Sequence, residues 1–419
     1  MKVAFVLPAF PVLHNTFTLN EIVGLIRHGV DVSILSMSRP RDTLLNADVT
    51  KYGLLDRTRY FDTFGPERTD VPADCEPFMR YFRPKAPSRW RLLLHGSLRA
   101  PRRKVYPFNA VARHLAGEGF DVIHGAFGNR PATAALVLSR LSGIPFTFET
   151  HAYDLFVDFP FAQEKIAGAS AIFTICQHHR RYLVDACGAP DEKVHVVHVS
   201  PNTPMLAAAP ASGRCEGLIV SACRLDPIKG LTHALQAVAQ VRRQCPSVRY
   251  EIVGDGPLRG DLMAEAHRLQ IDDIVSFTGN VTNEEVCARI RRASVFILPS
   301  VVAPDGNRDG TPTAIAEAMQ LEVPVVSSAL SGIPELVEDG VTGILTAPGD
   351  VDALVSALHR LLADEPLRVR MGRAGREKVV REFNVDRNVA AVRACWAAVL
   401  GGRGPAPSTQ PSPVEWRLA

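Results

Sequence analysis

Two hydrophobic patterns alternate along the first part of the chain. Short apolar runs, such as residues 3–8 and 31–37, are typical of buried strands. Between them lie residues 16–29, whose apolar positions recur with helical spacing up to Gly29. A strand, a helix and a second strand in this order imply a right-handed crossover between parallel strands. The chain therefore begins as an α/β protein.

The same alternation starts again after residues 201–216, a segment rich in Pro, Ala and Ser. Such a change in composition is typical of a linker, and 419 residues are too many for one typical core. We expect a first doubly wound α/β domain at residues 1–200 and a second at residues 217–384. Residues 401–419 are of low complexity, and we expect them to be disordered.

Composition narrows the class of protein. The chain is 46% hydrophobic and 22% charged, with a formal net charge of +3, which argues against a general nucleic-acid binder. No apolar run reaches the ~18 residues that span a bilayer. The first residues go directly into a strand pattern rather than a signal peptide, so a cytoplasmic location is expected. Eight cysteines without CxxC spacing predict reduced thiols and no structural metal.

One segment departs from this even charge. Residues 80–104 contain nine basic residues and no acid, interleaved with aromatic residues and leucines. Three interpretations stay open for this segment. It could dock on an anionic membrane at the inner face, form a solvated basic face, or contact nucleic acid. Membrane docking is the interpretation we favour, and nucleic acid is the one we favour least.

The most informative stretch follows the apolar run at residues 295–300. Its polar loop should emerge at the carboxyl end of a strand, where open α/β sheets bind ligands. Thr311, as a predicted N-cap, and Pro312 then introduce a helix, and the first amides of that helix, near Thr313 and Ala314, would attract a phosphate. Asp309 and Glu317 flank the helix start and suit hydroxyl groups.

A second loop carries two cations between a strand and a helix. Arg224 and Lys229 stand five residues apart, after the apolar run at residues 218–223. Arg can bind a diphosphate as a bidentate fork, and Lys can bind it as a point charge, with a helix N-terminus behind both. A salt-bridged surface loop is the alternative.

These motifs together resemble the signature of retaining glycosyltransferase family 4. The resemblance rests on Asp309-x7-Glu317, on the Val-Pro-Val-Val and Gly-Ile-Pro-Glu stretches that follow, and on the Arg224 to Gly230 loop. It implies a GT-B fold, in which two Rossmann-like domains face a cleft and residues 385–400 form a helix that crosses back to the first domain. By match, Asp309 contacts the donor sugar, Glu317 holds the ribose hydroxyls, and the two cations neutralise the leaving diphosphate. The family pattern has Glu where this chain has Asp309.

The resemblance extends to weaker positions. The loop that ends in Asn15 is similar to the entrance loop of exopolysaccharide members, although His14 and Asn15 replace the usual Ser-Glu. His151 and Asp154 match a stretch in which the histidine faces the donor sugar, and a structural histidine is the alternative. The loops at Gly256 and Val281 would lie along the nucleotide and its base.

The expected function is transfer of a sugar, with retention, from a nucleotide-diphosphate sugar to a saccharide or polyprenyl-linked acceptor. A UDP-sugar is favoured over a GDP-sugar, and neither a cofactor nor a metal is expected. Two alternatives belong to other classes: a sugar-nucleotide epimerase or phosphorylase on the same fold, and a non-catalytic subunit that binds a nucleotide sugar.

Overall fold

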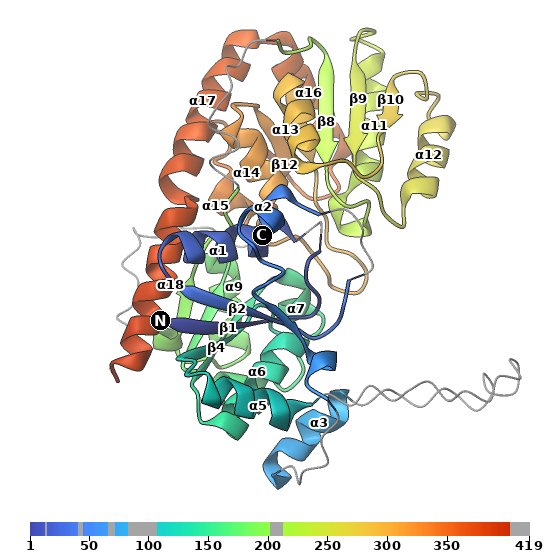
Figure 1. Cartoon of the computed structure of the whole chain (residues 1–419). Helices are drawn as coiled ribbons and strands as arrows, with labels where there is room; N and C mark the ends of the chain where they lie inside the picture. Colours follow the sequence, from blue (N-terminus) through green and yellow to red (C-terminus); the bar gives the residue numbers. More distant parts are fainter. Residues whose placement is uncertain (13–14, 41–44, 66–71, 83–106, 202–212, 403–419) are drawn as a thin grey trace, which may run out of the picture.

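The computed structural model describes residues 1–12, 15–40, 45–65, 72–82, 107–201 and 213–402. These residues form two halves, each built on a parallel sheet covered by helices on both faces, as Figure 1 shows. The predicted class, two doubly wound α/β units, is confirmed.

The first sheet has seven parallel strands in the order β3-β2-β1-β4-β5-β6-β7. Its strands are short apolar runs because a parallel sheet is buried on both faces. They are β1 (Lys2–Leu7), β2 (Asp31–Ser36), β3 (Thr58–Tyr60), β4 (Val122–Gly125), β5 (Phe146–Thr150), β6 (Ala171–Thr174) and β7 (Val194–Val196).

Helices close both faces of this sheet. One face packs against α3 (Glu76–Phe82), α5 (Phe108–Gly117), α6 (Arg130–Ser142) and α8 (Ala162–Gly168). The other face packs against α1 (Thr16–Arg27) and, from the far end of the chain, α18 (Val385–Leu400). Three short helices border the sheet: α2 (Ala47–Lys51), α7 (Ala152–Phe156) and α9 (Gln177–Arg181).

The second sheet has six parallel strands in the order β10-β9-β8-β11-β12-β13. They are β8 (Leu218–Ala222), β9 (Arg249–Val253), β10 (Val275–Phe277), β11 (Val295–Leu298), β12 (Val325–Ser328) and β13 (Gly343–Thr346). One face is covered by α11 (Leu231–Arg242), α12 (Arg259–Arg268) and α16 (Val351–Ala363). The other is covered by α13 (Asn283–Arg292), α14 (Thr313–Gln320), α15 (Ile333–Leu336) and the end of α17 (Glu365–Glu382).

Strand order reverses once in each sheet, between β1 and β4 and between β8 and β11. Loops leaving such a point diverge to opposite faces and leave a crevice at the carboxyl edge of the sheet. The loops that carried the sequence motifs follow β8 and β11, so the fold places them at this crevice.

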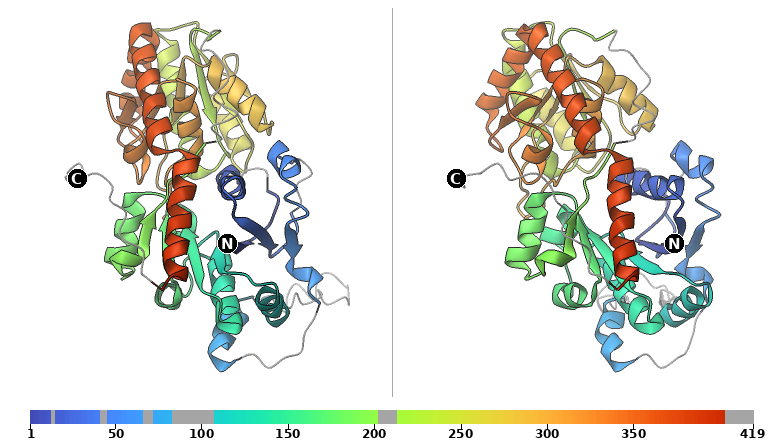
Figure 2. Two further views of the ribbon diagram at one scale, coloured as in Figure 1. Left: turned by 60° about the vertical axis from the view of Figure 1, so that its left-hand side comes forward. Right: turned by 90° about the vertical axis from the view of Figure 1, so that its left-hand side faces the viewer.

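The last two helices join the halves. α17 lies on the second sheet, and α18 continues along the first, as both views of Figure 2 show. Trp396 of α18 is completely buried against the first sheet, and its Nε1 donates a hydrogen bond to Thr147 Oγ1 at 3.1 Å.

Glycines bring the halves together at the base of the crevice. A Cβ at Gly310 would come within 2.6 Å of Ile175 Cδ1, and one at Gly332 within 2.7 Å of Cys176 Cβ. Beside them, the Glu335 carboxylate accepts the backbone N–H of Gln177 at 2.8 Å. At Gly332 the close atom is the Cβ of Cys176, which cannot turn away, so a larger side chain there would push the two halves apart.

The region from residue 41 to 107, where the sequence pattern fades, contains α2, β3 and α3. Of the basic segment, only residues 80–82 lie within the described part, and Arg80 there pairs with Glu76 at 2.8 Å on the surface. The other basic residues lie outside it, so membrane docking stays a prediction. Among the helices that the structure describes, none is both long and apolar enough to cross a membrane.

The contact between α18 and the first sheet makes a stability prediction. Trp396→Ala should lower the free energy of unfolding by about 3–5 kcal/mol, because it removes a fully buried ring and its hydrogen bond. Leu400→Ala, at an exposed position of the same helix, should cost under about 0.5 kcal/mol. Urea unfolding followed by circular dichroism compares the two, and equal losses would contradict the packing role of α18.

Candidate active site

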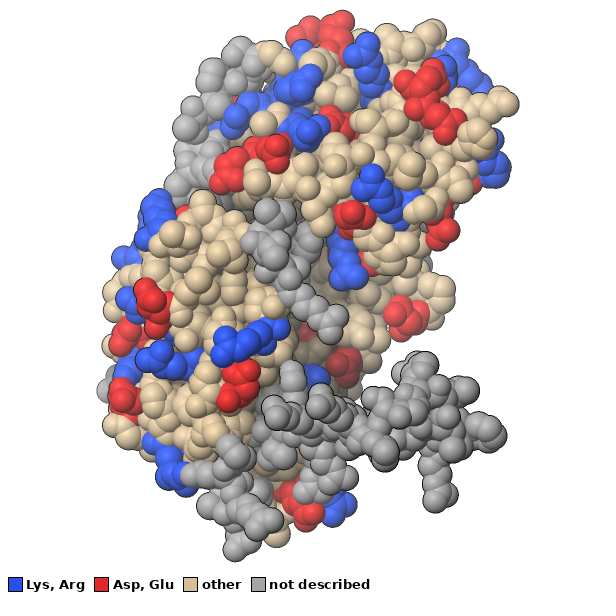
Figure 3. Space-filling model, turned by 45° about the vertical axis from the view of Figure 1, so that its right-hand side comes forward, with Lys and Arg blue, Asp and Glu red and all other residues tan. Residues whose placement is uncertain are grey.

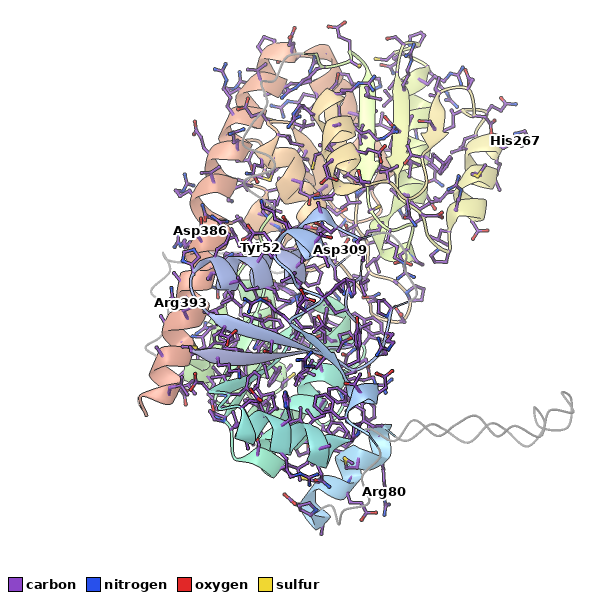
Figure 4. The ribbon with its side chains drawn as sticks, in the orientation of Figure 1. Tyr52, Arg80, His267, Asp309, Asp386 and Arg393 are labelled. Carbon is purple, nitrogen blue, oxygen red and sulfur yellow. The ribbon has the colours of Figure 1, made fainter. Side chains whose placement is uncertain are left out.

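A deep cleft separates the carboxyl edges of the two sheets. Figure 3 shows the molecule hollowed between its halves, and Figure 4 places Asp309 where the halves meet. Residues from both halves line the cleft. Ten of the residues singled out from the sequence are among them: Asn15, His151, Arg224, Lys229, Val281, Asp309, Thr311, Thr313, Ala314 and Glu317.

Lys229 lies in a 3₁₀ turn between β8 and α11, directly before Gly230. Gly230 adopts a φ of +63°, and a Cβ there would come within 1.9 Å of the Pro299 carbonyl oxygen. Only glycine permits this approach, which brings the turn against the end of β11. The Lys229 side chain, 16% exposed, is thereby directed toward the loop that carries Asp309.

Lys229 and Asp309 form a buried ion pair. Lys229 Nζ lies 2.6 Å from Asp309 Oδ1, and Ser300 Oγ donates a hydrogen bond to Asp309 Oδ2 at 2.6 Å. Burial alone lowers the pKa of Lys229, but the Asp309 carboxylate raises it, and the net pKa lies above its ordinary value. Lys229 is therefore a fixed positive charge at the cleft wall.

Arg224, by contrast, is held loosely. Its side chain is 60% exposed, and its Nε lies 3.1 Å from Asp226 Oδ2. Exposed pairs of this kind contribute at most about 1 kcal/mol, so a ligand phosphate can displace Asp226 at little cost. The two cations thus differ. Lys229 is held in position before a ligand binds, whereas the Arg224 side chain can move to meet a ligand.

The helix α14 begins at the cleft with its amides open. The first intrahelical bond runs from Ile315 N to Pro312 O at 3.1 Å, so the amides of Thr313 and Ala314 precede it. The predicted cap at Thr311 is wrong by one residue. Pro312 is the N-cap because its backbone, with a ψ of 122°, is still extended. The amide pair that would meet a phosphate is unchanged by this correction.

Glu317 lies one turn inside α14 and is 6% exposed. Among the described residues it has no hydrogen-bond partner, and burial raises its pKa to about 7. A buried acceptor without a donor is unfavourable, so hydroxyl groups of a ligand would stabilise it. The Glu317 carboxyl group thus lies in the cleft wall without hydrogen-bond donors, and the hydroxyl groups of a ligand would supply them.

His151 follows β5 on the opposite wall. Its ring packs against those of Phe17, at 4.6 Å between centroids, and Phe127, at 5.0 Å. Both ring nitrogens are buried without a hydrogen-bond partner among the described residues. Burial lowers the pKa of His151 to about 3, so the imidazole is neutral.

Two residues expected in the site do not line the cleft. Asp154 is buried below His151, where its carboxylate accepts the backbone N–H of His151 at 2.9 Å and that of Gly128. It therefore supports the loop rather than facing a ligand. Gly256 packs on the Arg224 loop, where a Cβ would lie 2.7 Å from Leu225 N. Gly254 lines the cleft in its place.

Two further residues line the cleft and were not predicted from the sequence. Tyr153 projects from α7, and Arg308 lies beside Asp309, with its guanidinium carbon 4.4 Å from the centre of the Phe156 ring. Arg308 could have been found, because it is a cation in the loop already singled out. Nothing in the sequence indicated a role for Tyr153, apart from its position two residues after His151.

One group of described residues brings three potential metal-ligand atoms together. Glu21, His124 and Glu149 each offer one such atom, all within 4.8 Å of one another. The group lies inside the first half, outside the lining of the cleft. Glu21 and Glu149 are already hydrogen-bonded to each other, so we assign no ion to them.

Comparison with known proteins decides the family. The family model described as Glycosyltransferase Family 4 matches residues 14–200, and the model of glycosyl transferases group 1 matches residues 211–378. AmsK, the amylovoran biosynthesis glycosyltransferase of Erwinia amylovora, is 30% identical over 92% of this chain and 96% of its own length. The chain is a family 4 glycosyltransferase. The predicted family is confirmed, and with it an enzyme that uses a nucleotide sugar and retains anomeric configuration.

Further comparisons agree with this family 4 assignment. WcaL of Escherichia coli K12, a provisional colanic acid biosynthesis glycosyltransferase by name, is 30% identical over 94% of this chain and 99% of its own length. HepE of Anabaena, solved in complex with UDP, superposes with a TM-score of 0.69 at 17% identity, covering 95% of this chain and all of HepE. The structural likeness confirms the GT-B fold.

Because the pKa of Glu317 is raised in the folded state, we predict that Glu317 lowers the free energy of unfolding by an amount that depends on pH. Below its ordinary value of 4.5, folded and unfolded chains both hold the proton, and the shift costs nothing. As the pH rises from 4.5 to about 7, the unfolded chain ionises first, so the folded state loses roughly 3 kcal/mol. Glu317→Gln removes this loss. The ligand-free variant should therefore be more stable than wild type at pH 8 but not at pH 4.5.

Differential scanning calorimetry at the two pH values measures this difference. Glu284→Gln, an exposed acid on α13 that lines the same cleft, is the matched control and should behave like wild type at both. If Glu317→Gln and Glu284→Gln shift the unfolding temperature equally, burial does not control the ionisation of Glu317.

Proposed function

We propose that this family 4 glycosyltransferase takes its sugar from a UDP-sugar, with a GDP-sugar as the second choice. The acceptor is a saccharide or a polyprenyl-linked saccharide, and the pathway is synthesis of a cell-surface polysaccharide. The names of AmsK and WcaL, which refer to amylovoran and colanic acid, support the pathway. The HepE complexes with UDP and UDP-glucose support the donor.

The main support for the proposal is the positive charge of Lys229, which the ion pair with Asp309 holds in the cleft wall. A donor whose diphosphate lies at the start of α14 would meet the Thr313 and Ala314 amides from one side and Lys229 from the other. Arg224 can swing from Asp226 to the same phosphates. Donors arranged before the reaction stabilise charge that develops in the transition state, and here that charge is on the leaving diphosphate.

The acids and the histidine then hold the rest of the donor. Glu317 accepts hydrogen bonds from the ribose hydroxyls, and Asp309 meets a hydroxyl of the transferred sugar while it keeps Lys229 in place. His151 faces that sugar from the other wall and orients it as a neutral imidazole. Val281 and Asn280 line the same cleft and would lie along the base of the donor.

The bond changes follow from retention. The bond from the anomeric carbon to the diphosphate oxygen breaks, and a bond to the acceptor hydroxyl oxygen forms on the same face. The acceptor proton passes to the departing phosphate oxygen. This front-side substitution needs no covalent sugar–enzyme intermediate, and the cations supply the charge stabilisation that it requires.

A donor panel tests the proposed function. The protein is incubated with UDP-, GDP- and ADP-sugars, with and without polyprenyl-diphosphate-sugar acceptors, and release of free nucleotide is followed. Acceptor-dependent release of UDP is the expected result. Conversion of one UDP-sugar into another without an acceptor, or release driven by inorganic phosphate, would instead support an epimerase or a phosphorylase.

The phosphate site makes a quantitative prediction. Lys229→Ala should lower turnover about 10²- to 10³-fold, the usual loss when one preorganised charge-stabilising donor is removed. Lys378→Ala, on α17 away from the cleft, is the matched control and should retain wild-type turnover. Turnover within threefold of wild type for Lys229→Ala would show that Lys229 does not stabilise the leaving group.

A further inference from the structure

We propose that Arg308 and Tyr153 form a subsite for an acceptor that carries a negatively charged group beside its reacting sugar. The charged group is a carboxylate or a phosphate, and the sugar packs on the Tyr153 ring. The inference rests on the proposed function in that the donor occupies the second half of the cleft. It adds to that function the charge of the acceptor.

Arg308 reaches from the second half of the molecule to the first. It lies in the loop after β11, and its guanidinium carbon is 4.4 Å from the centre of the Phe156 ring in α7. The neighbouring Asp309 instead contacts Lys229 and Ser300, both within the second half. Arg308 is therefore placed at the first-half wall of the cleft, where the bound donor leaves space for an acceptor.

The Arg308 guanidinium is held in place, but its terminal nitrogens are free. Its Nε donates a hydrogen bond to Gly306 O at 3.1 Å, and the Phe156 ring supports its face. In the part of the chain that the structure describes, neither Nη1 nor Nη2 has a hydrogen-bond partner, and no carboxylate pairs with the guanidinium. Two such nitrogens match two oxygens of a carboxylate or a phosphate.

The side chains around Phe156 do not compensate the charge of Arg308. His178 and His179 both pack on the Phe156 ring. Burial lowers the pKa of each, and the charge of Arg308 lowers it further, so both imidazoles are neutral at pH 7. Arg308 is thus a half-buried cation that lines the cleft without a counter-ion, and an anionic ligand would stabilise it.

Tyr153 supplies a surface for the sugar next to this charge. Its side chain is 50% exposed although it lines the cleft. Tyr153 and Phe156 are three residues apart in α7 and so lie on one face of this helix. An exposed aromatic ring can pack on the C–H face of a sugar and bury apolar surface of both. A sugar on Tyr153 would therefore place a charged substituent within reach of Arg308.

This arrangement discriminates against an uncharged acceptor. An uncharged sugar on Tyr153 would shield the guanidinium from water and offer it no anionic partner, which is unfavourable. Two kinds of acceptor carry a suitable anion: a saccharide with a uronic acid carboxylate, and a saccharide linked to a polyprenyl carrier by a diphosphate. Both present paired oxygens to the two free nitrogens of Arg308.

Three glucose derivatives that differ in charge test the subsite. Methyl glucoside is uncharged, methyl glucuronide carries a carboxylate, and glucose with a methyl diphosphate on its anomeric oxygen carries phosphates. Each is titrated into the whole protein and followed by NMR. UDP is present at saturation, so that the diphosphate derivative cannot occupy the donor site.

We expect wild type to bind at least one charged derivative about 10- to 100-fold more tightly than methyl glucoside, the usual effect of a charged hydrogen bond. Tighter binding of the glucuronide identifies a uronic acid acceptor, and tighter binding of the diphosphate identifies a carrier-linked one. No preference for either charged derivative would overturn the proposal.

Substitutions assign the preference to Arg308. Arg308→Gln should abolish it and leave the affinity for methyl glucoside within twofold of wild type, because only the charge is lost. Tyr153→Ala should weaken all three derivatives about 2- to 10-fold, because an aromatic face does not distinguish their charges. Arg181→Gln is the matched control. Arg181 is an exposed cation near His178, outside the cleft lining, and its loss should leave the preference intact.

A preference that survives in Arg308→Gln would contradict the assignment. So would an equal loss for all three derivatives, since Arg308 would then support the shape of the cleft rather than bind the anion. Affinity for UDP tests the donor site separately, and Arg308→Gln should bind UDP as wild type does. If wild type does not bind UDP, the proposed donor is wrong, and the same comparison without UDP still decides the role of Arg308.

Discussion

The buried ion pair between Lys229 and Asp309 is the interaction on which the rest of the cleft depends. It joins the loop after β8 to the loop after β11, and the close approach of Gly230 to Pro299 makes it possible. Removal of one partner from a buried pair commonly costs about 3–5 kcal/mol, because the other charge is left uncompensated. The ion pair therefore holds the Lys229 ammonium group at one position in the cleft wall, whereas an unpaired lysine in water would be mobile.

The parallel topology explains why such distant residues meet. The loops after β5, β8 and β11 all leave a sheet at its carboxyl edge, and the two edges face each other. The start of α14 then contributes its amides to the same space. α18 and the contact of Glu335 with the start of α9 keep the two halves at this separation. The contacts that hold the two halves together therefore also determine the shape of the cleft.

The sequence allowed the fold class and the main loops to be predicted because both depend on local patterns. Apolar runs mark the strands, and Arg224, Lys229, Asp309 and Glu317 follow strand ends, where ligands bind. Asp154 and Gly256 were expected in the site because they stand in the right loops, but a loop position does not say which way a residue faces. The contact between Glu21 and Glu149 could not be predicted from the sequence, since only the packing of α1 on the first sheet brings these residues together.

The most direct test of the account is whether Lys229 meets a diphosphate. Isothermal titration of wild type and Lys229→Ala with the nucleoside diphosphate of the donor and with its monophosphate measures this. Wild type should bind the diphosphate more tightly, and Lys229→Ala should lose roughly 1.5–3 kcal/mol of that affinity with little change for the monophosphate. An unchanged ratio of the two affinities in Lys229→Ala would contradict the placement of the diphosphate at the ion pair.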